Sequence, residues 1–542
     1  MPPTPATPPT PATPRTPATS ATSLTPPATG ATAPTITLRQ VRLGAGGPLS
    51  DVVIEGSRVA AVFPAGQAPA GPEGSGKSGT SGEPGEPGKP SEDVRLDGRT
   101  LLPGLWDSHV HMTQWARLRH RLDLSAAGSA RAAADTVGRA AALLPPGEPL
   151  IGAGFRDGLW PDTPHKDLLD ALVPDRPAVL ISMDLHCVWS NSAGLAAIGR
   201  RGHPTGLLRE DEANDAVARL PEASVEATDE RVREACAAAA ARGVTGVIDF
   251  EYADNVTDWT RRMRGGTVPL RVHASIRPAY LDAAIERGLR TGQLLDVPGG
   301  LLAVGPLKLF TDGSLNTRTA LCHDPYPGAA AGAPGAHGLG QVRPGDLVAL
   351  MRRAASHGIM PAVHAIGDRA NQIALDAFEE VRCPGRIEHG QLLAPEDIPR
   401  FAALGVTVGV QPAHAVDDRD VADRYWAGRT HRAYAFAELL AAGATLELGS
   451  DAPVSPLDPW LGIAAAVART GDERPAWHPE QRIPVRAALA ASARGRRLIR
   501  VGDPADLVIL DADPLTADTP TLRHLPVHAT LLAGNWTYGA TA

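Results

Sequence analysis

The chain has 542 residues, 43% of them hydrophobic, and a formal net charge of -8. This length allows for a large core and more than one domain. The acidic balance argues against a nucleic-acid-binding surface, and no apolar run reaches the roughly 18 residues of a membrane helix. We therefore expect a small-molecule partner and neither a nucleic acid nor a membrane.

The first segment, residues 1–34, consists of Pro, Thr and Ala repeats. It contains no apolar stretch of the signal-peptide kind, so we expect a disordered tail or a start codon placed too early. A mucin-like stalk is the functional alternative, but no secretion signal supports it. The four cysteines show no C-x-x-C spacing, which fits a reducing cytoplasm better than a disulfide framework.

The stretch GPEGSGKS, residues 71–78, matches the phosphate-loop pattern G-x-x-x-x-G-K-[ST]. Such a loop binds phosphate when a buried strand precedes it and a helix begins at its end. Here FPAGQAPA precedes the match and GTSGEPGEPGKPSED follows it, and this Gly- and Pro-rich sequence predicts neither element. We therefore interpret residues 66–93 as a Gly-rich loop and disfavour an NTPase.

Short alternating strands are predicted at both ends of the chain. Residues 35–103 contain TITLRQVRL, DVVIEGSRVAAVF and EDVRLDGRTLLPG, and residues 499–542 contain ADLVILDADP and ATLLAGNWTY. Because both ends are β-rich around a long middle, we expect one small β-sandwich built from the two chain ends.

Residues 104–498 alternate apolar runs with Ala-rich helical stretches, which is the βαβ rhythm of a parallel sheet. Eight runs end in polar or charged residues, and eight such units predict an α/β fold of the TIM (β/α)8 barrel type. Residues 113–226 separate the first two runs by more than one helix, so we expect an inserted subdomain over the barrel mouth. The runs are LLPGLWDSHVH, GVTGVIDFE, PLRVHASIR, LLAVGPLKLFTD, IMPAVHAIGD, GRIEHGQ, VTVGVQPAH and ATLELGSD.

Candidate metal ligands stand at the ends of these runs. The first run ends in His109 and His111, and because alternate strand residues face the same side, the two imidazoles can share one divalent ion. Alone this pair is a weak signal, since a histidine in a strand is more often exposed to solvent or buried in the core with its hydrogen bonds made. Later runs add, in order, Lys308, His364, His389 and Asp451. A barrel would bring all of these side chains to one mouth.

Lys308 needs an explanation, because an ammonium group repels metal ions. A lysine buried in LLAVGPLKLF beside cations would have a lowered pKa, and its neutral amine can react with carbon dioxide to form a carbamate. A carbamate has two oxygens and can bridge two ions. We therefore predict one site from His109, His111 and Asp451, a second from His364 and His389, and carbamylated Lys308 with a hydroxide between them.

Several blocks resemble the amidohydrolase superfamily, and most closely its YtcJ-like branch, which includes N-substituted formamide deformylases. In chain order they are PGLWDSHVHM, HCVWSNSAGL (residues 186–195), KLFTDGSLNTRTA, HAIGDRA, RIEHGQLL, LGSDAPVSPLDP and GDPADLVILDADP. The resemblance covers about residues 35–542. The chain departs from the family pattern between LAASARGRRLIR and VGDPADLV, where it is shorter.

The resemblance implies roles for individual residues. Asp451 would be both a metal ligand and the general base for a metal-activated hydroxide that attacks the substrate carbonyl. His414 would stabilise the oxyanion, although a structural role is equally open, and Arg318 and Asp312 are candidate substrate-binding or scaffold residues. The implied ligands of one or two divalent ions, with zinc expected, are His109, His111, Lys308, His364, His389 and Asp451.

The predicted reaction is hydrolysis of a non-peptide carbon–nitrogen bond, with a linear amide or an N-substituted formamide favoured. A cyclic amide, a urea or an ester stays open as the substrate, because pocket shape decides that choice. A metal-binding scaffold without catalysis is the alternative from another class. A homodimer is one expected form of assembly.

Overall fold

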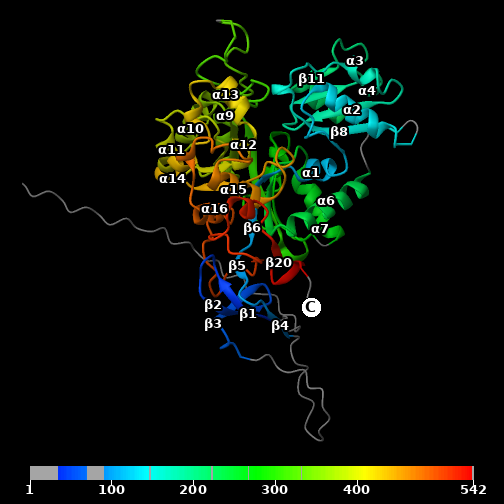
Figure 1. Ribbon diagram of the computed structural model, residues 1–542. Helices are drawn as coiled ribbons and strands as arrows, with labels where there is room; N and C mark the ends of the chain where they lie inside the picture. Colours follow the sequence, from blue (N-terminus) through cyan, green and yellow to red (C-terminus); the bar gives the residue numbers. More distant parts are fainter. Residues whose placement is uncertain are drawn as a thin grey trace, which may run out of the picture.

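The computed structural model describes residues 35–69, 91–145, 148–220, 224–266, 268–330 and 332–539. The predicted tail, residues 1–34, and the phosphate-loop match, residues 71–78, lie outside the described residues. The described chain forms a terminal β-domain at the bottom of Figure 1, a central barrel, and an inserted subdomain at the upper right. No helix in this part of the chain is long and apolar enough to cross a membrane.

Eight parallel strands form the central sheet in the order of the chain, which confirms the predicted barrel. The first and last strands meet at their carboxyl ends, where Val110 pairs with Ala452. There the Asp451 N–H donates to the His109 carbonyl at 2.7 Å, and the His111 N–H donates to the Ala452 carbonyl at 2.8 Å. The strands are β6 (Leu105–Val110), β12 (Val244–Asp249), β13 (Arg271–Ile276), β14 (Leu302–Phe310), β15 (Pro361–Ala365), β16 (Arg386–His389), β17 (Thr407–Val410) and β18 (Leu446–Leu448).

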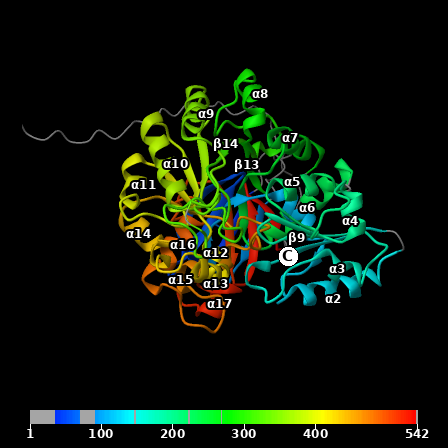
Figure 2. The same ribbon diagram turned by 90° about the horizontal axis from the view of Figure 1, so that it is seen from above.

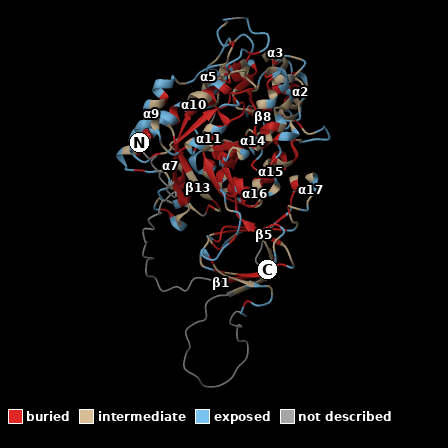
Figure 3. Cartoon of the chain, turned by 90° about the vertical axis from the view of Figure 1, so that its left-hand side faces the viewer, coloured by how far each residue is buried: buried red, intermediate tan, exposed pale blue. Residues whose placement is uncertain are grey.

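Helices cover the outside of this sheet, as the view from above shows (Figure 2). The strands read as near-continuous apolar runs because both of their faces are covered, and Figure 3 shows them buried. The α-helices of the barrel are α1 (Met112–Leu118), α6 (Val225–Ala240), α7 (Asn255–Gly265), α8 (Leu281–Glu286), α9 (Pro344–Ser356), α10 (Asp368–Val381), α11 (Ile398–Leu404), α12 (Pro412–Asp417), α13 (Arg419–Tyr425), α14 (Phe436–Ala441), α15 (Pro459–Ala468) and α16 (Val485–Ala491).

The inserted subdomain has a sheet and two apolar cores of its own. Its strands run from β7 to β11, while α1 packs on α6 and belongs to the barrel. The predicted limits of 113–226 for the insertion stay a prediction. Its elements are β7 (Leu122–Asp123), α2 (Ala130–Ala141), β8 (Leu150–Phe155), α3 (Lys166–Asp170), β9 (Ala178–Ser182), β10 (Cys187–Ser190), α4 (Ser192–Ala197), β11 (Leu207–Arg209) and α5 (Asp211–Ala218).

The terminal β-domain is assembled from both ends of the chain, as predicted. Its strands hydrogen-bond into one sheet in which β5 from the N-terminal part pairs with β19 from the C-terminal part. The strands share one apolar core. They are β1 (Thr35–Leu43), β2 (Leu49–Glu55), β3 (Arg58–Pro64), β4 (Ser91–Arg95), β5 (Thr100–Pro103), β19 (Leu507–Leu510), β20 (Val527–Leu532) and β21 (Asn535–Tyr538), with α17 (Thr519–Arg523) between β19 and β20.

A buried ion pair joins this domain to the amino end of the barrel. Arg271, which begins β13, donates to both carboxylate oxygens of Asp506 at 2.6 and 3.0 Å. Asp506 is buried and also accepts the Ala533 N–H at 2.9 Å, while its carbonyl accepts the Gly104 N–H at 2.8 Å. A bidentate pair of this kind fixes the orientation of the two parts.

We expect Arg271→Ala to lower stability by about 1–3 kcal/mol, because a buried carboxylate is left without its charged donors. The measurement is the urea midpoint followed by fluorescence and circular dichroism. Arg352→Ala is the matched control, since the Arg352–Glu380 pair is exposed and such pairs contribute about 1 kcal/mol or less. Equal midpoints for the two variants would contradict this role of Arg271.

Candidate metal centre

The six predicted ligands are all buried and all lie at the carboxyl end of the barrel. Parallel strands point their carboxyl ends at one mouth, so residues far apart in the sequence meet there. His109 is on β6 and His111 follows it. Lys308, His364 and His389 lie on β14, β15 and β16, and Asp451 follows β18.

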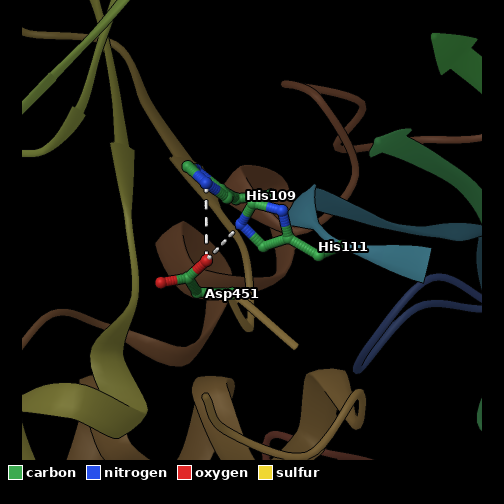
Figure 4. Close-up of side chains that lie close together, drawn as sticks. All are labelled: His109, His111 and Asp451. Atoms are coloured by element: carbon green, nitrogen blue, oxygen red, sulfur yellow. Dashed lines mark ion pairs between the residues drawn. The ribbon is translucent and has the colours of Figure 1, made fainter. Parts of the chain in front are cut away.

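One carboxylate oxygen of Asp451 lies between two imidazoles. Asp451 Oδ1 is 3.4 Å from His109 Nε2 and 3.3 Å from His111 Nε2, as Figure 4 shows. Ligand atoms that share a tetrahedral ion at about 2.0–2.2 Å lie roughly 3.4 Å apart, so this spacing fits a divalent ion. The three side chains therefore form a candidate metal-binding group.

Neighbouring side chains orient two of the histidines. His109 Nδ1 donates to Glu388 Oε2 at 2.6 Å, which leaves Nε2 without a proton. His389 Nδ1 donates in the same way to Gln411 Oε1 at 2.9 Å. Fixing the proton on Nδ1 prepares Nε2 for an ion, and this is the usual second layer of a metal site.

The sequence interpretation missed Glu388 and Gln411. Glu388 is fully buried and Arg386 donates to it, and Arg386 also donates to Glu447 at 2.6 Å. Burial would raise the pKa of Glu388, but the charges of Arg386 and His109 hold it far below its usual value. A signal was available: Arg386 and Glu388 are alternate charged residues within a predicted buried strand.

Lys308 is buried beside His109 and between two aromatic rings. Its Nζ lies 3.1 Å from His109 Nε2 and over the rings of Phe250 and Phe310, at 4.5 and 5.1 Å from their centres. Burial lowers the pKa of Lys308 to about 7, although the charges of Glu388 and Asp451 oppose this. A substantial fraction of the amine is therefore neutral near neutral pH and able to react with carbon dioxide.

A second group of side chains that could hold a metal ion differs from the predicted pair of His364 and His389. His389, His414 and Asp451 place their ligand atoms within 4.8 Å of one another, whereas His364 belongs to neither group. His364 Nε2 donates to the Gly313 carbonyl at 3.2 Å, and its ring lies 4.4 Å from that of His389. Its role as a ligand stays a prediction.

His414 presents an unpaired ring nitrogen. Its Nδ1 accepts from Gln391 Nε2 at 3.3 Å, while its buried Nε2 has no hydrogen-bond partner among the described residues. With Nδ1 accepting, the proton lies on Nε2. This N–H can donate a hydrogen bond to a substrate oxygen, as the predicted role of His414 in stabilising the oxyanion requires.

The two predicted substrate-binding residues lie on the loop after β14. Asp312 is fully buried and accepts the backbone N–H groups of Leu321, Ile366 and Gly367 at 2.8–3.0 Å, so it holds two mouth loops together. Arg318 donates to the Asn316 carbonyl at 3.0 Å, and its guanidinium lies 5.3 Å from the centre of the Tyr425 ring. Direct substrate contact by either residue stays a prediction.

A cavity of about 540 Å³, open solvent included, lies beside the metal-binding residues. The inserted subdomain contributes Phe155, Arg156, Met183 and Asp184, and the barrel contributes residues such as Asn316, His414, Asp417 and Val454. This position, between the subdomain and the mouth, suits a substrate whose reactive group faces His414.

Comparisons with known proteins agree with this geometry. The model of an amidohydrolase family matches residues 94–538. A Bacillus subtilis (strain 168) protein named "Putative amidohydrolase YtcJ" is 31% identical over 491 residues, covering 83% of this chain and 90% of that protein. N-substituted formamide deformylase of Arthrobacter pascens is 26% identical over 506 residues, covering 83% of this chain and 90% of the enzyme.

Among solved structures, an uncharacterised metal-dependent hydrolase from Pyrococcus horikoshii OT3 superposes with a TM-score of 0.70 at 25% identity. The match covers 90% of this chain and 99% of that structure. With the barrel, the histidine–aspartate group and the family model in agreement, the chain belongs to the amidohydrolase family.

Proposed function

We propose that this chain hydrolyses a non-peptide carbon–nitrogen bond, with N-substituted formamides and other linear amides as the favoured substrates. The observation that carries the proposal is the single Asp451 oxygen between His109 Nε2 and His111 Nε2. The similarity to a protein named N-substituted formamide deformylase supports the substrate class. The four cysteines, all unpaired, support a reducing cytoplasm as its location.

The metal centre follows from the donor set. His109, His111 and Asp451 would hold one divalent ion, for which zinc suits the nitrogen and oxygen donors, and His364 and His389 with carbamylated Lys308 would hold a second. When bound, such ions supply a Lewis acid for the carbonyl and lower the pKa of a water molecule. The protein's part is to orient the donors through Glu388 and Gln411.

Asp451 is the general base of the proposed reaction. Burial would raise the pKa of Asp451, but the charges of His109, His389 and His111 and a hydrogen bond from His111 hold it well below its usual value. The carboxylate is therefore ionised at neutral pH and can take a proton from the attacking water. It then passes this proton to the leaving nitrogen, while His414 Nε2–H donates to the carbonyl oxygen.

A hydrolysis screen tests the proposal. Metal-reconstituted protein is offered N-alkyl- and N-arylformamides, other linear amides, ureas, lactams and esters. Turnover of formamides or linear amides above the rest supports the proposal. A preference for lactams, ureas or esters would show that the proposed substrate class is wrong. A metal-loaded protein with no turnover on any compound would favour a non-catalytic scaffold.

We expect Lys308→Ala to lose metal and activity together, because the bridging carbamate is gone. Elemental analysis measures the metal, and intact mass with and without bicarbonate shows whether wild-type protein gains carbon dioxide. A short carboxylic acid would restore part of both by supplying a surrogate bridge. Lys166→Ala is the control, since Lys166 forms a surface pair with Asp167. A Lys308→Ala protein with full metal and rate would exclude the bridge.

We expect Asp451→Asn to keep part of its metal but to lose at least about a hundredfold in rate. The variant removes one ligand oxygen and the proton acceptor but keeps the histidines, and general acid–base catalysis contributes about 10²–10⁴-fold. Asp472→Asn, at an exposed loop position, serves as the control. A near-normal rate for Asp451→Asn would rule out Asp451 as the base.

A further inference from the structure

His186 begins the block HCVWSNSAGL and has no role in the mechanism above. It lies in the turn between β9 and β10 of the inserted subdomain, and its Nδ1 donates to Glu210 Oε2 at 2.8 Å. Two residues here have a positive φ: Leu185, which precedes His186, with φ 65°, and Glu210 itself with φ 50°. Non-glycine residues take up such conformations at a cost, and that cost is concentrated at functional sites.

The carboxylates around His186 are fixed by the loop that follows β14 of the barrel. Asp184 accepts from Asn316 Nδ2 at 2.9 Å and from the His186 backbone N–H at 3.2 Å. Glu210 Oε1 accepts from Thr319 Oγ1 at 3.2 Å. The inserted subdomain therefore docks on the loop of the Lys308 strand at the position where it carries His186.

Neighbouring carboxylates favour the charged form of His186. Burial lowers the pKa of His186, but the hydrogen bond to Glu210 and the charges of Asp184 and Glu210 raise it to about 8. Asp451 also contributes to this rise, and the charge of His186 in turn lowers the pKa of His364. What places His186 at the mouth of the barrel is its two carboxylate neighbours, Asp184 and Glu210, which bond to Asn316 and Thr319 of the loop after β14.

The second nitrogen of the ring is available. In the described part of the chain, His186 Nε2 has no hydrogen-bond partner, since the contact with Glu210 uses Nδ1. The cavity between subdomain and barrel is lined by Asp184 on one side and by His414 on the other. His186 adjoins this cavity through Asp184, which lines it and accepts the His186 backbone N–H, and the Nε2–H of the imidazolium is left as a donor that a ligand can use.

We propose that His186 is a substrate-contacting residue that the inserted subdomain supplies to the barrel, donating a hydrogen bond from Nε2–H to the carbonyl oxygen of the amide. This inference rests on the proposed function. His414 approaches the same oxygen from the barrel, so the two imidazoles form one donor pair across the cavity. A charged donor strengthens its bond as negative charge develops on the oxygen, so the contact favours the transition state over the bound substrate.

The first test uses kinetics on the best substrate of the screen. We expect His186→Ala to lower kcat by about 10²–10³-fold, the usual loss for one oxyanion donor, with KM and metal content close to wild type. His186→Gln, which keeps a neutral N–H, should retain part of the rate. His203→Gln is the matched control: His203 lies in the same subdomain near Glu212 but away from the barrel loop, and its rate should not change. A normal kcat for His186→Ala would overturn the inference.

The pH profile separates a donor from a merely structural residue. The charged and titratable groups that face His186 are Asp184 and Glu210 from the subdomain and Asp451 and His364 from the barrel. Because the pKa of His186 is raised, its imidazolium persists below about pH 8 and is lost above it. Glu210→Gln should move the alkaline fall in kcat to lower pH. An alkaline limb that stays in place in this variant would contradict the role of His186.

The second test does not need turnover. Methylphosphonate, a tetrahedral anion, is titrated calorimetrically into metal-loaded protein. We expect His186→Ala to bind it about 10- to 100-fold more weakly than wild type or His203→Gln, because one charged hydrogen bond is lost. If the wild type cleaves nothing in the screen but this difference holds, the proposed function fails and the contact stands. Equal binding by His186→Ala, or no binding by the wild type, would overturn the contact.

Discussion

The position of the Asp451 carboxylate between His109 and His111 depends on how the barrel closes. Asp451 takes a left-handed backbone conformation, with φ 57°, directly after β18. Its N–H is bonded to the carbonyl of His109, and Asp107 Oδ1 accepts the N–H of Ser450 at 2.9 Å. The hydrogen bonds that join the last strand to the first are therefore the same ones that set the ligand geometry. A barrel left open at this seam would have no such site.

Buried charge below the site is the second constraint. In the barrel interior Arg386 lies between Glu388 and Glu447, and Glu388 receives the Nδ1–H of His109. Such an arrangement is costly to desolvate and is tolerated only when every charge has partners. This arrangement fixes the orientation of His109, because its ring cannot rotate without breaking the hydrogen bond to Glu388. Charged residues thus take interior positions that apolar side chains fill in other barrels.

Much of the barrel and of the site was predictable from the sequence, because both follow local patterns. The ends of the eight runs carried His109, His111, Lys308, His389 and Asp451, and strand periodicity with barrel topology was enough to place them together. Glu388 and Gln411 were harder, since their roles depend on which strands become neighbours. His109 and Glu388 are 279 residues apart, and no sequence period links them.

The second group of candidate metal ligands shows a further limit of prediction from the sequence. The sequence interpretation paired His364 with His389, whereas the structure groups His414 with His389 and Asp451. Both histidines end apolar runs, so the sequence pattern does not distinguish them. The difference lies in where the side chains end up: the ligand atoms of His414, His389 and Asp451 lie within 4.8 Å of one another, while His364 Nε2 bonds to the Gly313 carbonyl.

The loop after β14 connects the mouth of the barrel to the inserted subdomain. Its Asp312 holds the loop that follows β15, its Gly313 carbonyl orients His364, and its Asn316 and Thr319 anchor the carboxylates around His186. Gly313 has to be glycine, because a Cβ there would collide with Thr319. One tight loop on the Lys308 strand therefore fixes both the ring of His364 and the docking of the inserted subdomain. Substrate specificity can then change through the subdomain's cavity-facing residues while the ligand set stays in place, provided that this loop keeps its shape.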